Sequence, residues 1–551
     1  MTAPAATQKF DGIYDLVVIG AGINGTGIAR DAAARGLRVA LVEKEDIGSG
    51  TSSWSGRLIH GGLRYLEQGD VALVRESLRE REILFRLAPH LVKPVPLMLP
   101  FYSHNRRSKW AVRAGMVLYD ILSFDKSTVT HRVLSRADTI ARFPDMDADG
   151  LKGAAIFMDG QVVWSERLCT EVALQAHAEG CNIFTHARVD GFVQEGDAVG
   201  GVTYVDELTG TRHRLGASLV INAAGPWVDA VLKPHAPAAQ KRHIGGAKGS
   251  HLVLDPFPGA PKDVVYYESR IDGRLVLIIP WGDRYMIGTT DKKFDEDPDT
   301  AVADAAEVEY LLGEVNALIP QAKLTVADIL YTYSGVRPLP FVPAQSEWKV
   351  PRSHVIHDHA PDCRGLLSII GGKLTTYRSL AEETVDDVFR RLGRKVPPCT
   401  TAKSLFPGAR VNDGVTFRAQ LAANTAATRE TVDRLVDIYG ARAGDILDLG
   451  HQDPRLLEVL DAETGAISAE LVFTYRTEFC RTLTDALIRR IMVGLNGNCG
   501  RDALARAAAV LAECEGWDTA RRTQEIDDYL RYIRRFEVPG TPPQQTAGAA
   551  Q

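Results

Sequence analysis

A glycine turn between two short apolar runs near the start of the chain constrains its fold more than any other feature. Tyr14–Gly20 is rich in Val and Ile, which is typical of a buried parallel strand. The sequence GAGING at 20–25 and a helical stretch to about Arg35 follow, and a second buried strand runs over Leu37–Glu43. A strand, a G-x-G-x-x-G turn, a helix and a second strand in this order predict a dinucleotide-binding βαβ unit.

Each glycine of the turn has its own task in such a unit. Gly20 allows the tight turn, Gly22 lets the backbone approach a pyrophosphate, and Gly25 lets the helix pack closely on the strand. The helix N-terminus then directs N–H groups at the phosphates. Glu43, 18 residues after Gly25, is expected to accept hydrogen bonds from ribose hydroxyls. The predicted contacts in the turn are Gly20, Gly22, Ile23, Asn24 and Gly25.

The fingerprint does not distinguish NAD from FAD, but two later segments favour FAD. The small, hydroxyl-rich loop at 48–53 offers Thr51, Ser52 and Ser53 as donors to a pyrophosphate. The sequence IIGGKLTT at 369–376 combines a strand, a double glycine and a helix start. Such a helix N-terminus would face the flavin N1–C2=O edge, which becomes negative on reduction. The contacts predicted there are Gly371, Gly372, Leu374 and Thr375.

Buried strands far apart in the chain predict one parallel sheet interrupted by insertions. Two further buried strands, Ser218–Gly225 and Leu366–Gly372, continue the sheet. The first ends in the small residues Ala224 and Gly225, which are expected to contact the cofactor. We expect an α/β fold with a Rossmann-like, doubly wound FAD-binding sheet, an inserted, mainly antiparallel substrate domain and a C-terminal helical domain. The predicted segments are disordered tails at 1–13 and 538–551, the FAD-binding domain at 14–95, 155–235 and 351–399, substrate-binding segments at 96–154 and 236–350, and the helical domain at 400–537.

Composition excludes several classes of protein. The 64 Lys+Arg and 70 Asp+Glu residues give a net charge of −6, so a globally basic nucleic-acid binder is excluded and no nucleic-acid partner is expected. The seven cysteines form no C-x-x-C pair, which indicates a reducing compartment and predicts neither a metal site nor a flavin disulfide reductase. No signal peptide and no apolar run of about 18 residues is found, which leaves contact with a membrane surface open.

Seven motifs occur in order: GAGINGTGIARDAAARGLRVALVE, TSSWSGRLIHGGLRYLE, NAAGPWVD, KGSHLVL, LIIPWGDRYMIGTTD, YTYSGVRPL and GGKLTTYRSLAEE. Over about residues 14–400 the chain thereby resembles the FAD-dependent, respiratory sn-glycerol-3-phosphate dehydrogenases. The resemblance implies oxidation of sn-glycerol 3-phosphate to dihydroxyacetone phosphate and transfer of electrons to a membrane quinone. It also implies a cytoplasmic protein peripherally bound to the inner face of the plasma membrane.

Two alternatives stay open at this point. An oxidase would use the same substrate but pass electrons to oxygen and form hydrogen peroxide. A non-catalytic flavin-fold module that binds RNA or serves as a scaffold would need a spoiled substrate site, whereas His60, Arg64 and Arg337 are present. The residues do not indicate which quinone is used, and they leave a homodimer open.

Oxidation of a phosphorylated secondary alcohol needs a base for the hydroxyl proton and cations for the phosphate. In the sequence HGGLRY at 60–65, Gly61 and Gly62 let the backbone lie close to a flat ring, and His60 is the preferred base. His251 is the reserve base. Arg64 and Arg337 are expected to hold the phosphate and the reacting oxygen. The remaining candidate substrate contacts are Tyr65, Arg274 and Lys373.

A basic and aromatic cluster predicts the contact with an anionic membrane surface. Arg106, Arg107, Lys109 and Arg113 surround Trp110, and an apolar stretch follows them. This composition is typical of an amphipathic helix lying on anionic lipid. An ordinary helix at a domain edge is the alternative.

Overall fold

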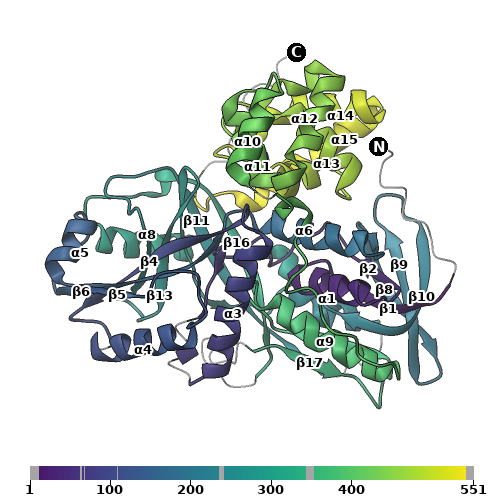
Figure 1. Cartoon of the computed structure of the whole chain (residues 1–551), viewed down its shortest axis with the longest axis horizontal. Coiled ribbons are helices and arrows are strands. Elements are labelled where there is room, and N and C mark those ends of the chain that lie inside the picture. Colours follow the sequence, from purple (N-terminus) through teal and green to yellow (C-terminus); the bar gives the residue numbers. More distant parts are fainter. Residues whose placement is uncertain are drawn as a thin grey trace.

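The computed structural model describes residues 12–62, 65–66, 69–107, 109–234, 241–342, 353–411 and 413–541, with the backbone alone at 109–111. The predicted tails fall outside this range up to residue 11 and from residue 542, and so does the candidate Arg64. Two sheet-based lobes lie side by side, and the helical C-terminal domain sits above them (Figure 1).

The first lobe is built on an eight-stranded sheet (Figure 1). Its central strand β1 (Tyr14–Ile19) lies parallel to β2 (Val39–Val42) on one side and to β10 (Arg212–Asn222) on the other. β18 (Leu366–Ile370) lies parallel to β10. The predicted interrupted parallel sheet is therefore confirmed. The outer strands are β17 (Val355–Asp358), β7 (Asn182–Phe184), β8 (Ala187–Glu195) and β9 (Ala198–Asp206).

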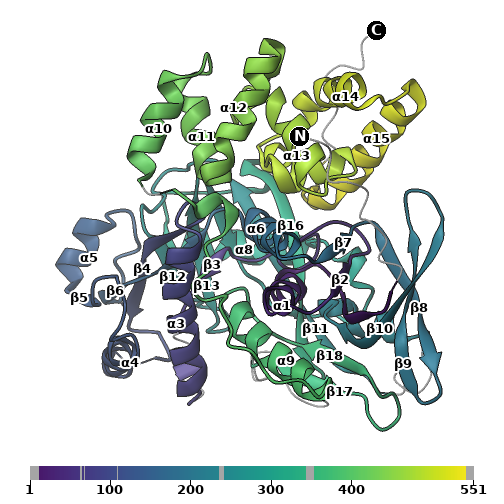
Figure 2. The same ribbon diagram turned by 45° about the vertical axis from the view of Figure 1, so that its right-hand side comes forward.

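Both faces of this sheet are covered, because side chains alternate along its strands. Leu16 and Val18 of β1 pack beneath α1 (Ile23–Ala34), α6 (Ser165–Ala178) and α9 (Tyr377–Arg391). Figure 2 shows α1 and α9 stacked over the sheet. Val17 and Ile19 pack on the opposite side with residues of the β8–β9 hairpin and of the short α7 (Val228–Leu232). Strands thus cover much of a face that helices cover in a doubly wound sheet.

A ten-stranded, mainly antiparallel sheet forms the second lobe. The predicted boundaries at 95 and 155 fall inside two of its strands, β4 and β6, so the sheet recruits more of the early chain than expected. The strands are β3 (Leu58–Ile59), β4 (Val92–Tyr102), β5 (Arg132–Leu134), β6 (Leu151–Val162), β11 (Ile244–Leu254), β12 (Val264–Glu268), β13 (Leu275–Trp281), β14 (Arg284–Gly288), β15 (Lys292–Lys293) and β16 (Ile329–Pro340). The helices joined to it are α3 (Val71–Leu87), α4 (Lys109–Leu122), α5 (Arg136–Arg142) and α8 (Ala305–Leu318).

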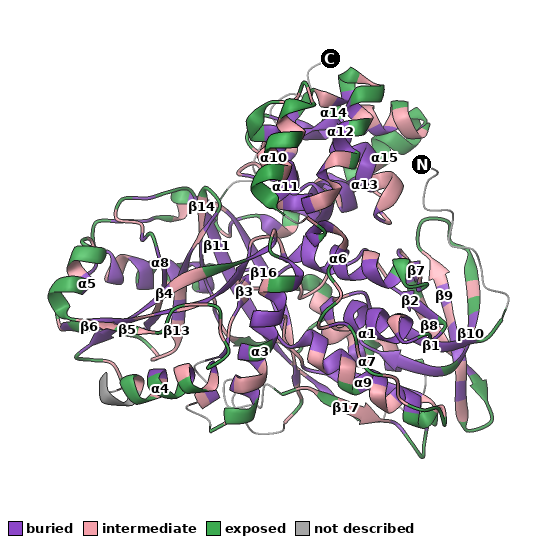
Figure 3. Ribbon diagram, in the orientation of Figure 1, coloured by how far each residue is buried: buried purple, intermediate pink, exposed green. Residues whose placement is uncertain are grey.

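The C-terminal domain is helical, as predicted. In α11 the Thr428 hydroxyl caps the N-terminus by accepting from Thr431 N. Val432 and Leu435 are fully buried, and Gly440 ends the helix with a φ of 57°. The helices are α10 (Gly414–Ala423), α11 (Arg429–Tyr439), α12 (Ala443–Gln452), α13 (Ser468–Thr477), α14 (Arg501–Glu515) and α15 (Thr519–Tyr532); β19 (Val459–Asp461) pairs with β20 (Ala466–Ile467). Burial is concentrated in the strands and inner helix faces (Figure 3).

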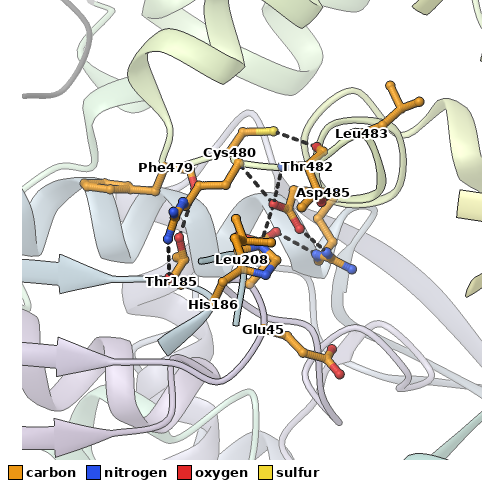
Figure 4. Close-up of polar contacts among 12 residues, drawn as sticks. Glu45, Thr185, His186, Leu208, Phe479, Cys480, Thr482, Leu483 and Asp485 are labelled. Carbon is orange, nitrogen blue, oxygen red and sulfur yellow. Dashed lines mark hydrogen bonds and ion pairs between the residues drawn. The ribbon is translucent and has the colours of Figure 1, made fainter. Parts of the chain in front are cut away.

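Buried charges join this domain to the first lobe. The carboxylate of Asp46, which follows β2, accepts from Arg489 at 2.6 Å and from Arg490 at 2.7 Å. His186 of the first lobe lies 2.8 Å from Asp485 (Figure 4). Because removing one member of a buried pair leaves an uncompensated charge, these contacts fix the position of the domain.

Candidate active site

Two adjoining cavities, of about 210 and 310 Å³, share part of their walls. The first is lined by the turn after β1, the second by strands of the ten-stranded sheet, and the segment after β18 lines both. Such a shape suits a long ligand that enters one cavity and presents its reactive end in the other. The lining residues common to both are Thr51, Ser55, Pro338, Gly371, Gly372, Lys373 and Leu374.

The three fingerprint glycines serve different purposes. Gly20 has a φ of 99°, and a Cβ there would lie 2.8 Å from Ala223 O. At Gly25 a Cβ would lie 1.8 Å from Gly20 O, so both positions require glycine for the fold itself. A Cβ on Gly22 would meet nothing nearer than Ser52 Oγ at 3.4 Å, and Gly22 lines the first cavity. The protein itself therefore does not require glycine at Gly22, and a side chain there would border the first cavity.

The hydroxyl loop after β2 divides its tasks in the same way. Ser52 Oγ accepts from Ile23 N at 3.0 Å at the start of α1 and lines the first cavity. Thr51 lines both cavities, and its hydroxyl donates to Val336 O at 2.6 Å. Ser53 was predicted to contact the pyrophosphate, but it is fully buried and donates to Gly48 O at 2.6 Å. Its role is to hold the loop.

Glu43 lines the first cavity, but its carboxylate also accepts hydrogen bonds from the backbone. Its two carboxylate oxygens accept from Ala21 N at 2.7 Å and from Glu45 N at 2.9 Å. Burial raises the pKa of Glu43, and these two backbone bonds oppose that shift. Each oxygen has a second lone pair with which it can accept from a ribose hydroxyl.

The segment after β18 forms the boundary between the cavities. Gly371 and Gly372 have φ values of 80° and 95°, which favour glycine. Asn24 Nδ2 donates to Gly371 O at 3.2 Å and thereby ties this turn to the start of α1. The predicted contacts Ala224 and Gly225 line the first cavity, and Leu374 and Thr375 line the second.

This cradle fits FAD. Small residues and the N-terminus of α1 line the first cavity, and its aromatic wall is Trp227, with Lys44 Nζ 4.2 Å from the ring centroid. Lys44, Trp227 and Val189 were missed in the sequence. Val189 comes from β8, whose apolar alternation indicates a strand but gives no sign that it borders a ligand.

The second cavity gathers most of the predicted substrate residues. Tyr65 and Lys373 line it together, with the lysine Nζ 3.6 Å from the centroid of the tyrosine ring. Arg274 lies directly before β13, where its Nε pairs with Asp272 at 2.8 Å. The remaining predicted residues on its wall are His60, Gly62, His251 and Arg337.

Arg337 is fixed by the turn that follows β14. Its Nη1 donates to Asp291 Oδ1 at 2.7 Å, and its Nη2 donates to Thr289 Oγ1 at 3.0 Å and to Thr290 O at 3.1 Å. All four residues line the second cavity. The sequence Gly-Thr-Thr-Asp at a strand end is the signal that could have located these three residues, which were not predicted as site residues.

His251 is a buried, uncharged imidazole. It stacks on Tyr333 with the ring centroids 4.8 Å apart, and neither ring nitrogen has a hydrogen-bond partner among the described residues. Burial lowers the pKa of His251 to about 3, reinforced by the charges of Arg337 and Arg57. Both ring nitrogens are thus buried on the wall of the second cavity.

A buried network holds the loop that carries His60. Gly61 N lies 3.1 Å from Tyr119 Oη and 3.2 Å from Asp159 Oδ1, and Arg81 Nη1 donates to Asp159 at 2.6 Å. Gly61 was predicted to contact the flavin, but a Cβ there would lie 2.3 Å from Tyr119 Oη, so it faces the protein. Gly25 and Gly61 line neither cavity.

Comparison with known proteins shows the family to which the chain belongs. Residues 15–378 match the model of the FAD dependent oxidoreductase family, and residues 399–522 match the C-terminal domain of alpha-glycerophosphate oxidase. Glycerol-3-phosphate dehydrogenase of Synechocystis sp. is 44% identical over 96% of this chain and 97% of its own length. Glycerol-3-phosphate dehydrogenase 2 of Mycobacterium bovis is 35% identical over 94% of this chain and 88% of its own length.

Among solved structures, the glycerol-3-phosphate dehydrogenase from Bacillus halodurans, complexed with FAD, has a TM-score of 0.77 at 27% identity and covers 98% of this chain and 97% of its own. The fold and the cradle thus define an FAD-dependent oxidoreductase. Within that class, the chain belongs to the glycerol-3-phosphate dehydrogenase family, as its motifs predict.

Proposed function

We propose that the protein oxidises sn-glycerol 3-phosphate to dihydroxyacetone phosphate in the second cavity. The observation that carries the proposal is the fixed fork of Arg337 on the wall of a cavity that adjoins the FAD cradle. Arginine suits a phosphate dianion because its planar fork matches two phosphate oxygens. Arg274 and Lys373 add positive charge to the same wall.

The side chains of the cavity divide the work of the reaction. FAD, when bound, supplies the acceptor for the hydride that leaves C2 of the substrate. Arg337 holds the phosphate and orients the C2 hydroxyl, and His60 removes the hydroxyl proton as the C2–O bond becomes a carbonyl. His251 provides a neutral nitrogen for a hydrogen bond within the cavity, and its position beside Arg337 makes it the reserve base.

The test is an anaerobic titration of the FAD-loaded protein with sn-glycerol 3-phosphate. We expect the flavin absorbance to bleach, whereas glycerol and sn-glycerol 1-phosphate leave it unchanged. Bleaching by dithionite but not by sn-glycerol 3-phosphate would show a competent flavin with another substrate.

A quinone is the acceptor that we propose, because one face of α4 is suited to a bilayer. Val117, Leu118, Ile121, Phe124 and Val129 on or just after α4 are exposed, with Ile121 61% and Phe124 78% accessible. Figure 3 shows the exposed residues along this helix at the edge of the second lobe. No helix in the described part of the chain is long and apolar enough to cross a membrane. Exposed aliphatic and aromatic side chains grouped in this way mark an interaction surface.

The lipid-facing surface that we propose differs from the predicted basic cluster. Arg107 Nη1 pairs with Glu268 at 2.7 Å, and Glu268 also accepts from Arg106 N. Arg113 is exposed, and the side chains of Lys109 and Trp110 lie outside the described residues. Met116 faces the core instead of the solvent. The apolar residues after Met116 therefore carry the proposal more than the charges before it.

The opposite face of the same helix contacts the loop that carries His60. Tyr119, one position after the exposed Leu118, is buried and hydrogen-bonded to Gly61 N beside His60. One helix thus contacts solvent outside and the substrate loop inside, which supports electron transfer to an acceptor dissolved in lipid. Stoichiometric hydrogen peroxide formation in air would favour an oxidase instead.

A further inference from the structure

Three histidines gather at an edge of the first lobe, and none of them lines either cavity. His243 precedes β11, His357 lies in β17, and His359 follows that strand. One ring nitrogen from each lies within 4.8 Å of the other two. The ring centroids are 4.6 Å apart for His243 and His357, 4.7 Å for His357 and His359, and 5.3 Å for His243 and His359.

From this juxtaposition we propose that His243, His357 and His359 bind a divalent transition-metal ion such as Zn²⁺. Three neutral imidazoles are the donor set that zinc and its neighbours prefer, whereas calcium and magnesium require oxygen ligands. A tetrahedral ion with Zn–N bonds of about 2.0–2.1 Å spaces its ligand atoms roughly 3.3 Å apart. Side-chain rotations that move the ring nitrogens by about an ångström would therefore bring them to the spacing of zinc ligands.

An unsatisfied nitrogen in the cluster gives independent support. His243 is only 9% exposed, and its Nε2 has no hydrogen-bond partner among the described residues. A buried polar atom without a partner destabilises the fold, and a bound ion would supply that partner. His357 is half-buried, so solvent can supply the fourth ligand.

The surrounding backbone holds the rings before any ion arrives. His243 N donates to the Asp229 carboxylate at 3.0 Å, and His243 O accepts from Phe341 N at 2.8 Å. His357 is paired with Ser368 in the β17–β18 ladder. His359 Nε2 lies 2.8 Å from the hydroxyl of the same serine, the kind of outer contact that fixes the tautomer of a metal ligand.

The ion would act as a cross-link between the two lobes. β17 is an edge strand of the eight-stranded sheet, whereas His243 leads into β11 of the ten-stranded sheet. Both lobes also meet at Gly371, where an added Cβ would lie 3.3 Å from Ser353 O and 3.9 Å from Pro338 O. Metal at the three histidines would thus stabilise the joint on which both cavities depend. This inference goes beyond the proposed function and needs no turnover for its test.

The experiment uses untagged, FAD-loaded protein that is treated with a chelator and then dialysed against limiting Zn²⁺ or Co²⁺. We expect about one equivalent of zinc by elemental analysis, and a visible cobalt d–d band in the difference spectrum. His357→Ala, at a half-buried position, should weaken zinc binding at least tenfold while keeping FAD, and His243→Ala should do the same. His213→Ala, outside the cluster, is the matched control and should bind zinc normally.

Two results would overturn the assignment. One is wild-type protein that retains no more zinc than His357→Ala. The other is stoichiometric zinc that survives in both cluster variants, which would place the ion elsewhere. Thermal unfolding of wild type and His213→Ala should shift upward with zinc, whereas unfolding of His357→Ala should not.

Discussion

Asp291 Oδ1 accepts a hydrogen bond from Arg337 Nη1 at 2.7 Å, across the junction between the turn after β14 and the strand β16. The ion pair aims a guanidinium at a cavity before substrate arrives. Preorganised charge of this kind costs no reorganisation during the reaction, which is why its position matters as much as its sign.

Arg337→Ala should keep FAD and lose turnover. Removing a charge that stabilises a transition state costs about 3 kcal/mol, so we expect kcat/KM for sn-glycerol 3-phosphate to fall roughly a hundredfold. Arg337→Lys should recover only part of this loss because lysine lacks the fork. Steady-state kinetics with a soluble dye measure the effect. Arg390→Ala, an exposed arginine on α9, is the control, and an equal loss there would refute the assignment.

Gly22→Val and Gly25→Val should fail in different ways. A side chain at Gly22 meets only Ser52 Oγ at 3.4 Å, so this variant should fold but exclude FAD from the first cavity. A side chain at Gly25 would collide with Gly20 O, so that variant should not fold. Circular dichroism and bound flavin per chain separate the two outcomes. Full flavin occupancy in folded Gly22→Val would contradict our placement of the pyrophosphate.

The pH dependence of flavin reduction should identify the base. Because burial lowers the pKa of His251 to about 3, this ring stays neutral from pH 5 to 9, and a reaction that uses it as base would not slow on acidification over that range. A rate that decreases as the pH is lowered from about 7 indicates a base with an ordinary imidazole pKa. We expect that fall in wild type and in His251→Ala, and its loss in His60→Ala, measured by anaerobic stopped flow. A flat wild-type profile would transfer the role to His251.

Negative charges placed on the exposed apolar residues of α4 should weaken binding to a membrane. Ile121→Asp combined with Phe124→Asp removes about 3 kcal/mol of apolar burial, so binding to anionic vesicles should weaken about a hundredfold. Quinone reduction in vesicles should slow, and dye-linked activity should persist. Val415→Asp, at a 79% exposed position on α10, is the matched control. Unchanged vesicle binding in the double variant would exclude α4 as the contact.

The joint between the first lobe and the helical domain should weaken at alkaline pH. Burial alone would lower the pKa of His186, but Asp485, 2.8 Å away, raises it above its usual value, and the same pairing lowers the pKa of Asp485 (Figure 4). The raised histidine pKa stabilises the fold fully below about pH 6.5, and this contribution disappears as pH rises through the folded-state value. The lowered pKa of Asp485 stabilises the fold at neutral and alkaline pH, and this contribution is lost only in acid.

His186→Gln should therefore cost about 1.5–3 kcal/mol near pH 6 and less at pH 9. Thermal unfolding across this range measures the difference from wild type. His451→Gln removes a histidine that lies 3.5 Å from Asp448 in an exposed pair and should change little. A difference between His186→Gln and wild type that grows with pH would contradict a raised histidine pKa in the folded state.

The first lobe could be predicted because its signals are local. The βαβ turn, the hydroxyl loop and the double glycine at 371–372 each combine a strand with the residues that follow it, so the phosphate-binding end was visible in the sequence. The second lobe was less visible, since β4 and β6 join their sheet through pairing between distant segments. The predicted boundaries at 95 and 155 therefore fall inside β4 and β6.

Within the site, the sequence did not predict which way individual residues face. Ser53 and Gly61 belong to the right loops but face the protein, because one donates to Gly48 O and the other lies against Tyr119. Thr289 and Asp291 face the cavity, yet only the observed pairing with Arg337 reveals this. Of the three clustered histidines, His357 and His359 belong to one segment, and no sequence spacing indicates that His243 joins them.

The order of strands in the first sheet has a consequence for synthesis of the protein. Synthesis of β1 is complete at residue 19. Synthesis of β18, which lies two strands away in the sheet, is complete only at residue 370. At 5–20 residues per second, roughly 20 to 70 s separate the two events. During that interval the growing chain carries the phosphate-binding turn without the wall that closes it. A message truncated before codon 370 would therefore yield a polypeptide without Gly371, Gly372, Lys373 and Leu374, which form the wall shared by both cavities.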